Sequence, residues 1–334
     1  MRNKILSAIF VIVFSLQGKA QEVQFTQFYA TPLFLNPAFT GLTYGHRFSA
    51  NYRNQWPGIK TTYVTYMAAY DYNVSNLNSG IGVYFLQDVA GTSNLITTHK
   101  CFNYAYSIKI NRTSEVRAGM SLALIGKRID ISNLIFNDQL VTGASSSAEA
   151  GSAQKVNYFD VGLGALYNSR NIWLGMSLKH LNEPNTSLVD GDLSTLPVYL
   201  SIHGGYRYII SARGAGKTKL EEFVSASMHF RKQEKYDQLD IGAYYFKNVM
   251  NFGLWYRGLP FKKYKAGYGN QESIAILIGL EIPDKNFRVG YSYDVTISRL
   301  GFNNTLGSHE ISMVFEIVQK RKKSRRVLIS CPKF

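Results

Sequence analysis

The residues best suited to chemistry do not form a recognised catalytic motif. Positions 214–218 share the Gly-Lys-Thr end of a phosphate-binding loop, but Ser211 stands where that loop needs its first glycine. The next stretch, 222–230, alternates like a strand, whereas a helix should follow such a loop. We therefore interpret 214–218 as a flexible basic turn and not as a nucleotide site.

Metal and nucleophile patterns are missing from the sequence as well. None of the six histidines lies in an HExxH motif or a close Cys/His cluster, and no serine lies in a GxSxG motif. We expect no catalytic residue, no cofactor and no metal, and a surface enzyme is the weakest functional hypothesis. Cys101 and Cys331 lie too far apart for a disulfide framework, so we expect two unpaired thiols.

The N-terminus has the features of an export signal. Arg2 and Lys4 precede an uncharged, mostly apolar stretch at 5–16, and Gly18 and Ala20 supply the small residues before a cleavage site. We expect residues 1–20 to be a signal peptide that is removed before Gln21. The mature chain therefore works outside the cytoplasm.

Composition favours an all-β protein. After the signal, no run approaches the roughly 18 apolar residues of a membrane helix, and the mean hydropathy is −0.12. Aromatic residues make up 14% of the chain, and 28 glycines stand against 8 prolines. Apolar and polar residues alternate along the whole chain, as in half-buried strands. This alternation predicts about fourteen strands, at 46–53, 62–72, 80–88, 95–110, 115–130, 158–168, 172–181, 198–210, 222–231, 237–246, 250–257, 273–282, 287–298 and 308–317.

The lengths of the connections favour a membrane barrel over a soluble β-protein. Tight turns at 111–113, 169–171, 247–248 and 283–286 alternate with longer links at 131–157, 182–197, 258–272 and 299–307. The exceptions are a ten-residue link at 211–220 on the tight side and a short link near 231–236 on the other. Short periplasmic turns opposite long extracellular loops are typical of bacterial outer-membrane barrels. We predict a transmembrane antiparallel β-barrel over 46–318, with both termini in the periplasm.

One face of the predicted strands carries charges and glycines. Placing these charges against lipid would cost about 2–4 kcal/mol for a basic residue near the midplane. We therefore expect them to line the lumen and to form ion pairs that rigidify the barrel. They are Asp160, Asp240, Arg288, Asp294, Glu310 and Glu316.

Three regions outside the strands are candidates for contacts. Residues 21–45 hold an aromatic run too irregular for a strand, and we predict a segment that plugs the barrel or closes its inner rim. Residues 319–334 form a periplasmic tail with seven positive charges and no acid, which predicts an acidic partner, anionic lipid or a solvated tail, but not nucleic acid. A small, polar stretch at 144–151 predicts a mobile outer loop. The candidate partner-binding residues are Ile135, Phe136, Leu140, Lys320, Arg321, Lys322 and Lys323.

The segment before the first strand also carries a family resemblance. The stretch QFYATPLFLNPAFTG, followed by YRNQWP at 52–57, resembles the start of the PorP/SprF family of Bacteroidetes. GMSLKHL at 175–181, GLWYRG at 253–258, GSHEI at 307–311 and the closing CPKF continue the likeness in order, whereas the basic insert at 320–326 departs from it. The signature residues are Asn36, Pro37, Ala38, Gly41, Arg53, Gln55 and Trp56.

The resemblance implies an outer-membrane component or accessory of the type IX secretion system. Members of this family assist secretion or surface attachment of large adhesins, including those used in gliding motility. The implied partners are a secreted adhesin or its C-terminal signal domain and the periplasmic lipoproteins of the machine, within outer-membrane lipid. The alternative hypothesis is a plugged transport channel for small hydrophobic or polar solutes, because fourteen strands with an N-terminal plug also describe long-chain fatty-acid transporters.

Overall fold

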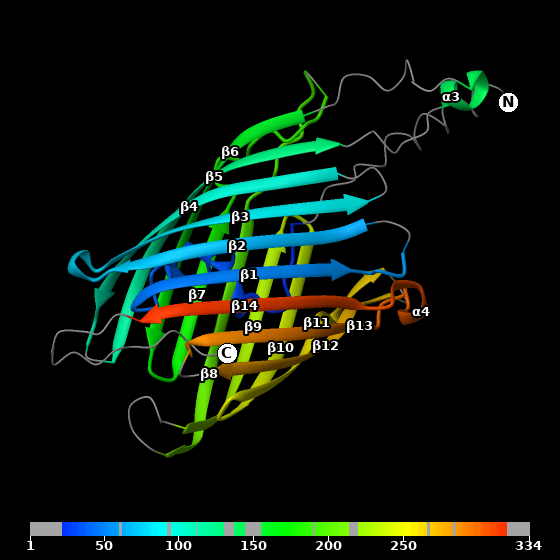
Figure 1. Cartoon of the computed structure of the whole chain (residues 1–334). Coiled ribbons are helices and arrows are strands. Elements are labelled where there is room, and N and C mark those ends of the chain that lie inside the picture. The colour runs from blue at the N-terminus through cyan, green and yellow to red at the C-terminus, as the bar shows by residue number, and fades with distance from the viewer. Residues whose placement is uncertain are drawn as a thin grey trace.

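Fourteen antiparallel strands form a closed barrel in the computed structural model (Figure 1). Each strand pairs with its neighbours in sequence, and β1 closes the ring against β14. The structure describes residues 22–59, 62–91, 95–111, 113–129, 137–143, 155–189, 191–213, 220–265, 268–282 and 285–318. The strands are β1 Gly45–Gln55, β2 Thr62–Val74, β3 Ser79–Gly91, β4 Leu95–Lys109, β5 Ser114–Ile129, β6 Lys155–Ser169, β7 Ile172–Lys179, β8 Tyr199–Arg213, β9 Leu220–Gln233, β10 Tyr236–Lys247, β11 Met250–Lys265, β12 Tyr268–Ile282, β13 Phe287–Thr296 and β14 Ser308–Val318.

The predicted alternation is confirmed along the barrel wall. In β4, His99, Cys101 and Asn103 are buried on the inner face, whereas Phe102 and Tyr104 point outward and are 45% and 39% exposed. Apolar side chains therefore cover most of the outside of the barrel, whereas the inner face carries the buried polar side chains together with apolar ones. Among the described residues, no helix has the length and hydrophobicity needed to cross a membrane.

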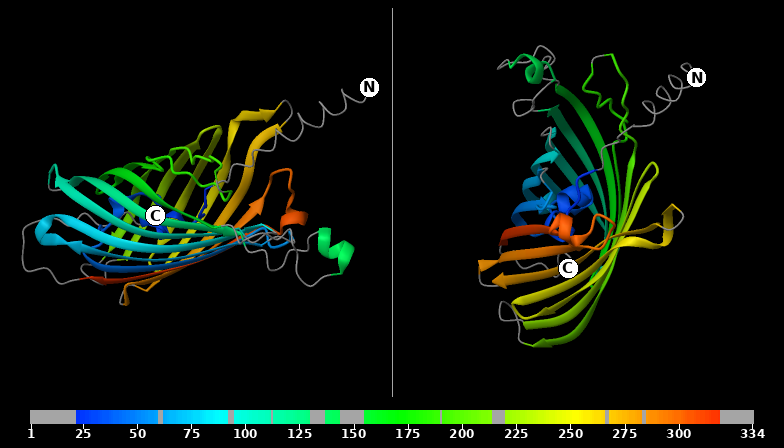
Figure 2. Two further views of the ribbon diagram at one scale, coloured as in Figure 1. Left: turned by 90° about the horizontal axis from the view of Figure 1, so that it is seen from above. Right: turned by 90° about the vertical axis from the view of Figure 1, so that its right-hand side faces the viewer.

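One predicted loop is wrong. Residues 258–272 do not form a long loop, because β11 continues to Lys265 and β12 begins at Tyr268. The glycine and lysine residues here are typical of a loop. Register shifts after Arg257 and Leu259 nevertheless allow β11 and β12 to continue pairing. Gly258 has φ +147°, a conformation that side-chain-bearing residues rarely adopt. The result is a long hairpin at this rim (Figure 2).

The described parts of the remaining connections include short helices and most of a long loop. The connection at 180–198 holds a single bridge between Asn185 and Thr195, and the β13–β14 link contains α4 (Phe302–Thr305). Shorter helical turns are η3 (Ser75–Leu77), between β2 and β3, and α3 (Asn137–Thr142), between β5 and β6. The predictions for 144–151, 214–218 and Cys331 lie outside the described residues; Cys101 is free and buried.

The chain before β1 runs inside the barrel. We call residues 22–43 the N-terminal segment; it contains η1 (Phe28–Ala30), α2 (Pro32–Leu35) and η2 (Pro37–Phe39). Two prolines and three short turns prevent it from joining the sheet as a strand. Figures 1 and 2 show it, in dark blue, enclosed by the strands.

The buried apolar core consists of the N-terminal segment and the inner face of the wall. Phe28 and Phe39 pack with Trp173, Tyr244 and Trp255 from the wall in one cluster. A second cluster joins segment and wall residues in the same way, and its largest members are Phe25, Leu33, Phe34, Tyr84, Leu86 and Ile125. The core of this protein is therefore inside the ring of strands.

Candidate functional site

Asn36 anchors the middle of the N-terminal segment to the wall. Its side-chain nitrogen donates hydrogen bonds to the carbonyl oxygens of Ala165 (3.0 Å) on β6 and Met176 (3.1 Å) on β7. Its side-chain oxygen accepts from the backbone N–H of Ala38 (2.9 Å) and caps η2. Asn36 is fully buried, so each of these bonds satisfies a group that water cannot reach.

Glycines on the wall make room for this segment. A Cβ on Gly164 would lie 2.0 Å from the Asn36 side-chain oxygen, and one on Gly119 would lie 2.3 Å from the Ala38 nitrogen. At the far end of the segment, a Cβ on Gly80 would lie 2.1 Å from the Thr40 carbonyl oxygen. The segment therefore approaches three strands more closely than any other residue type permits.

Arginine and aspartate side chains hold the end of the segment near β1. Arg117 donates to the carbonyl oxygens of Ala38 (2.9 Å) and Thr40 (2.5 Å). Asp71 accepts from the Gly41 N–H (2.8 Å) and pairs with Arg47 (2.7 Å). Gly41 has φ +66°, which turns the chain out of the lumen toward β1.

Glu310 on β14 holds the beginning of the segment. Its carboxylate accepts from the backbone N–H of Thr26 (2.7 Å) and of Gln27 (3.0 Å). Arg53, its direct cross-strand neighbour on β1, pairs with it at 3.1 Å and with Asp294 at 2.9 Å. One buried carboxylate therefore joins the seam of the barrel to the segment inside it.

Arg257 extends this network across β10–β13. Its guanidinium lies 3.2 Å from Asp294 and 3.4 Å from Asp240, and it donates to the Thr26 hydroxyl at 3.0 Å. Asp240 also pairs with Arg231 at 2.6 Å. Charges removed from water need partners of this kind. The predicted ion-paired lumen is confirmed, including the remaining pairs His180–Asp160 and Arg288–Glu316.

A third cluster fixes Glu22, the first described residue. Its carboxylate lies 3.3 Å from both Lys179 and His180, and His180 lies 2.9 Å from Asp160. Burial acts to lower the pKa of His180, but the Glu22 charge and the Asp160 hydrogen bond outweigh it and raise this pKa to about 9. Burial acts to raise the pKa of Glu22, but Lys179 and His180 hold it far below its usual range. Both groups are therefore charged at neutral pH.

A cavity of about 710 Å³ opens above Glu22 at the rim with the long 180–198 loop. We call it the mouth cavity. Its walls combine amide and aromatic side chains, including Gln55, Trp56 and Tyr63; the rings of Trp56 and Tyr63 meet edge to face with centroids 5.7 Å apart. Glu22 and Gln24 of the N-terminal segment also line it. Such walls offer hydrogen bonds and flat apolar surface to an extended ligand.

The predicted signature residues fall into two groups in the structure. Asn36, Pro37, Ala38 and Gly41 lie in the lumen, and Arg53 joins the Glu310 network, whereas Gln55 and Trp56 line the mouth cavity. Leu140 is on α3 and is 71% exposed. Ile135, Phe136 and the lysine and arginine residues at 320–323 lie outside the described residues. No group of three metal-ligating side chains occurs in the described part of the chain.

Sequence reasoning missed Thr26, Gln27, Arg231 and Arg257 as members of the network. Thr26 and Gln27 lie in an aromatic run, and the sequence alone indicates apolar packing there. In the structure, their backbone N–H groups donate to the Glu310 carboxylate. An arginine at an inward position of β11 was a usable signal for Arg257, because a buried charge implies partners.

The sequence segments that carry the family resemblance converge on the N-terminal segment. From GMSLKHL, the Ser177 hydroxyl donates to the Leu35 carbonyl oxygen at 2.8 Å. From GLWYRG, Trp255 packs edge to face on Phe28 with centroids 4.9 Å apart. From GSHEI, Glu310 accepts the two N–H groups described above. The resemblance therefore follows the residues that seat this segment.

Comparisons with known proteins agree with the family resemblance of the sequence. A family model described as "Type IX secretion system membrane protein PorP/SprF" matches residues 17–315. Curated protein sequences gave no match.

Among solved structures, the chain is similar to the Acinetobacter baumannii outer membrane protein Omp33 (TM-score 0.46, 10% identity, 83% of this chain and 100% of that one). It is also similar to the P. putida toluene transporter TodX (0.47, 11%, 85% and 93%) and to the CymD monoaromatic hydrocarbon channel (0.47, 12%, 87% and 93%). These likenesses are too distant to support an assignment of function. The family match covers most of the sequence, and the chain therefore belongs to the PorP/SprF family of type IX secretion system membrane proteins.

Proposed function

We propose that this component of the type IX secretion system is an outer-membrane barrel that assists secretion or surface attachment of a partner adhesin at its mouth cavity. The observation that carries the proposal is the position of that cavity next to the N-terminal segment. Glu22 and Gln24 line the cavity, and the residues after them pack against the inner face of the wall. A lumen occupied in this way favours a docked polypeptide over a solute in transit.

The outer membrane is the proposed location for a physical reason. A β-sheet can lie in lipid only when it closes on itself, because every backbone N–H and C=O group then finds a partner. Most outward side chains of this barrel are apolar, as lipid requires. The signal-like residues 1–20 supply the export route.

We further propose that the N-terminal segment is a plug. Its buried hydrogen-bonding groups are matched by Asn36, Arg117, Asp71 and Glu310 contacts with the wall, so leaving the lumen breaks several buried interactions at once. The basic residues Lys320 to Lys323 are proposed to contact acidic periplasmic parts of the machine.

The test is a comparison of surface proteins. In cells lacking the native gene, complementation with the Trp56→Ala, Gln55→Ala double variant should fail to restore the surface proteins that the native chain restores, as measured by mass spectrometry of shed and surface-labelled protein. Leu254→Ala, at an exposed outward position of β11, is the control and should restore them.

Full restoration by the mouth variant would refute the docking role. Rapid flux of small solutes through the native protein in liposomes would instead favour the transport channel.

A further inference from the structure

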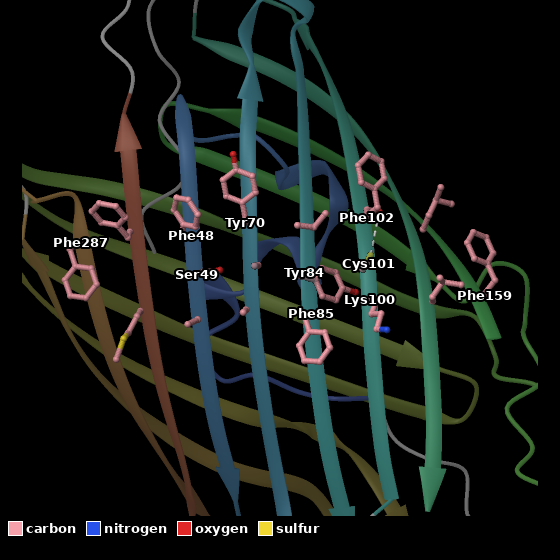
Figure 3. A pocket seen from close by; sticks show the side chains of 18 residues that line it. Phe48, Ser49, Tyr70, Tyr84, Phe85, Lys100, Cys101, Phe102, Phe159 and Phe287 are labelled. Carbon is pink, nitrogen blue, oxygen red and sulfur yellow. Dashed lines mark hydrogen bonds between the residues drawn. The ribbon is translucent and has the colours of Figure 1, made fainter. Parts of the chain in front are cut away.

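A groove crosses the outer wall of the barrel over β1–β4. It measures about 780 Å³, within the range of ligand pockets. The hollow forms because Ala50 and Ala68, direct cross-strand partners that both face outward, are much smaller than the side chains around them. Figure 3 shows Phe48, Phe85 and Phe102 around it, with Lys100 beside Phe85.

Lys100 is the exception in an apolar row. Cross-strand pairing links Lys100 to Phe85 on one side and Leu124 on the other. Continued in both directions, the row is otherwise apolar: Phe159, Leu124, Phe85, Ala68, Ala50, Met313, Val289, Leu280 and Met250. Lys100 is exposed, and it has no anionic partner in the described part of the chain. A cation on the lipid face is costly unless it meets an anion or water.

The next rows toward the long-loop rim place Lys100 near the membrane interface. The adjacent outward row contains Thr98, Gln87 and Tyr66, which are polar or amphipathic. Rows on one face are about 6.8 Å apart, since each residue advances roughly 3.4 Å. The Lys100 side chain can therefore extend from the apolar row to the level of lipid headgroups.

A second cationic centre lies farther toward the same rim. Arg128 on β5 and Lys155 on β6 are exposed, face outward and are direct cross-strand partners. Like charges in this position repel each other. Arg128 is four residues beyond the partner of Lys100, which separates the two centres by about 14 Å along the strands.

On the opposite wall, outward-facing lysines lie across from carboxylates. On β9 and β10, Lys232 faces Asp237 and Lys247 faces Glu222 across the strand pair. The described outward positions of β1–β6 hold Lys100, Arg128 and Lys155 and no carboxylate. At these described positions, the wall that carries the groove therefore has three outward cations without an outward carboxylate, whereas the named cations of β9 and β10 each face a carboxylate.

We propose that this wall binds a lipid carrying two phosphate groups, in the leaflet on the long-loop side. Its acyl chains lie in the groove over Ala50 and Ala68. One phosphate contacts Lys100, and the other lies between Arg128 and Lys155 and removes their repulsion. Charge complementarity selects this occupant over a purely apolar protein surface, which would leave three cations without partners.

Native mass spectrometry of the full chain, purified in detergent, tests the proposal. The probes are bisphosphorylated lipid A, the same lipid after both phosphates are removed, and inorganic phosphate. We expect one bisphosphorylated lipid per chain, weak binding of the dephosphorylated lipid, and no competition by inorganic phosphate. Each charge removed, in Lys100→Met or Arg128→Gln, should weaken lipid retention roughly fivefold, as expected for one basic residue near a membrane surface.

Two further variants test the groove separately from the charges and control for a general loss of positive charge. Ala68→Phe fills the groove without changing charge and should also weaken retention. Lys232→Gln removes a cation that faces Asp237 and should bind like the native chain; folding of each variant is checked by heat-modifiable migration on gels. Equal binding of both lipids, unchanged retention in Lys100→Met, or a protein that occupies the groove in the purified complex would overturn the proposal.

Discussion

Removing the Glu310 carboxylate should release the N-terminal segment and open the lumen. Glu310 accepts from two backbone N–H groups of the segment and pairs with Arg53. A hydrogen bond to a charged group contributes about 1.5–3 kcal/mol, so losing the two bonds from the Thr26 and Gln27 N–H groups should cost the seated segment about 3–6 kcal/mol. Since about 1.4 kcal/mol is a factor of ten, the displaced state of the segment should gain about two to four orders of magnitude in population in Glu310→Ala.

Single-molecule conductance in planar bilayers measures this population. Glu310→Ala should show frequent, long openings where the native chain is mostly closed, and Glu310→Gln, which keeps its shape and an acceptor oxygen, should fall between them. Gln27→Ala tests the segment's contacts without changing the seam. It removes the bond that Gln27 donates to the Glu310 carbonyl (3.0 Å) and the bond that it accepts from the Ser312 hydroxyl (2.6 Å), but leaves Arg53–Glu310 intact. Glu183→Gln, in the exposed loop after β7, is the matched control. A folded, inserted Glu310→Ala barrel that stays as closed as the native one would refute the reasoning.

Three further predictions follow from the same contacts. Gly164→Val should lower the melting temperature by several degrees on heat-modifiability gels, because its Cβ would lie 2.0 Å from the Asn36 oxygen. Gly269→Ala should leave the melting temperature unchanged, because the nearest atom to its Cβ would be 3.6 Å away. Equal shifts in the two variants would contradict the close fit at Gly164. The His180 pKa is raised to about 9 from 6.5, so its stabilising effect is complete below pH 6.5 and is lost as the pH rises through 9. The native chain should therefore lose more thermal stability between pH 6 and 10 than His180→Gln, and parallel losses would exclude the ion cluster as the cause. Deleting residues 320–334 should leave membrane insertion intact and weaken co-purification of periplasmic partners; unchanged complexes would exclude a role for the tail.

The strands of the barrel wall were predictable because the alternation of inward and outward side chains depends only on neighbouring residues in the sequence. Period-two alternation located all fourteen strands, since each inward residue sits between two outward ones whatever its partners are. The hairpin at 258–272 was not predictable, because register shifts at Gly258 depend on the partner strand and not on local sequence.

The site was predictable as a set of residues and not as an arrangement. Asp294 and Glu310 were identifiable as lumen charges from the cost of placing them in lipid. Their joint binding of Thr26, across more than 260 positions of sequence, is a property of the closed ring. Lys100 shows the opposite case: its outward position follows from the alternation of β4, but its apolar neighbours Phe85 and Leu124 follow only from the strand pairing.

The contacts also explain why the family resemblance is spread over the chain. Arg53 and Glu310 are cross-strand partners at the β1–β14 seam, where the first and last strands must meet to close the barrel. The same Glu310 carboxylate binds the Thr26 and Gln27 N–H groups, so the seam and the N-terminal segment share one group. In an unclosed sheet, Glu310 would lack Arg53 and the segment would lack its enclosing wall. Closing the ring and seating the segment are therefore coupled steps, and a substitution at either end of the chain should disturb both.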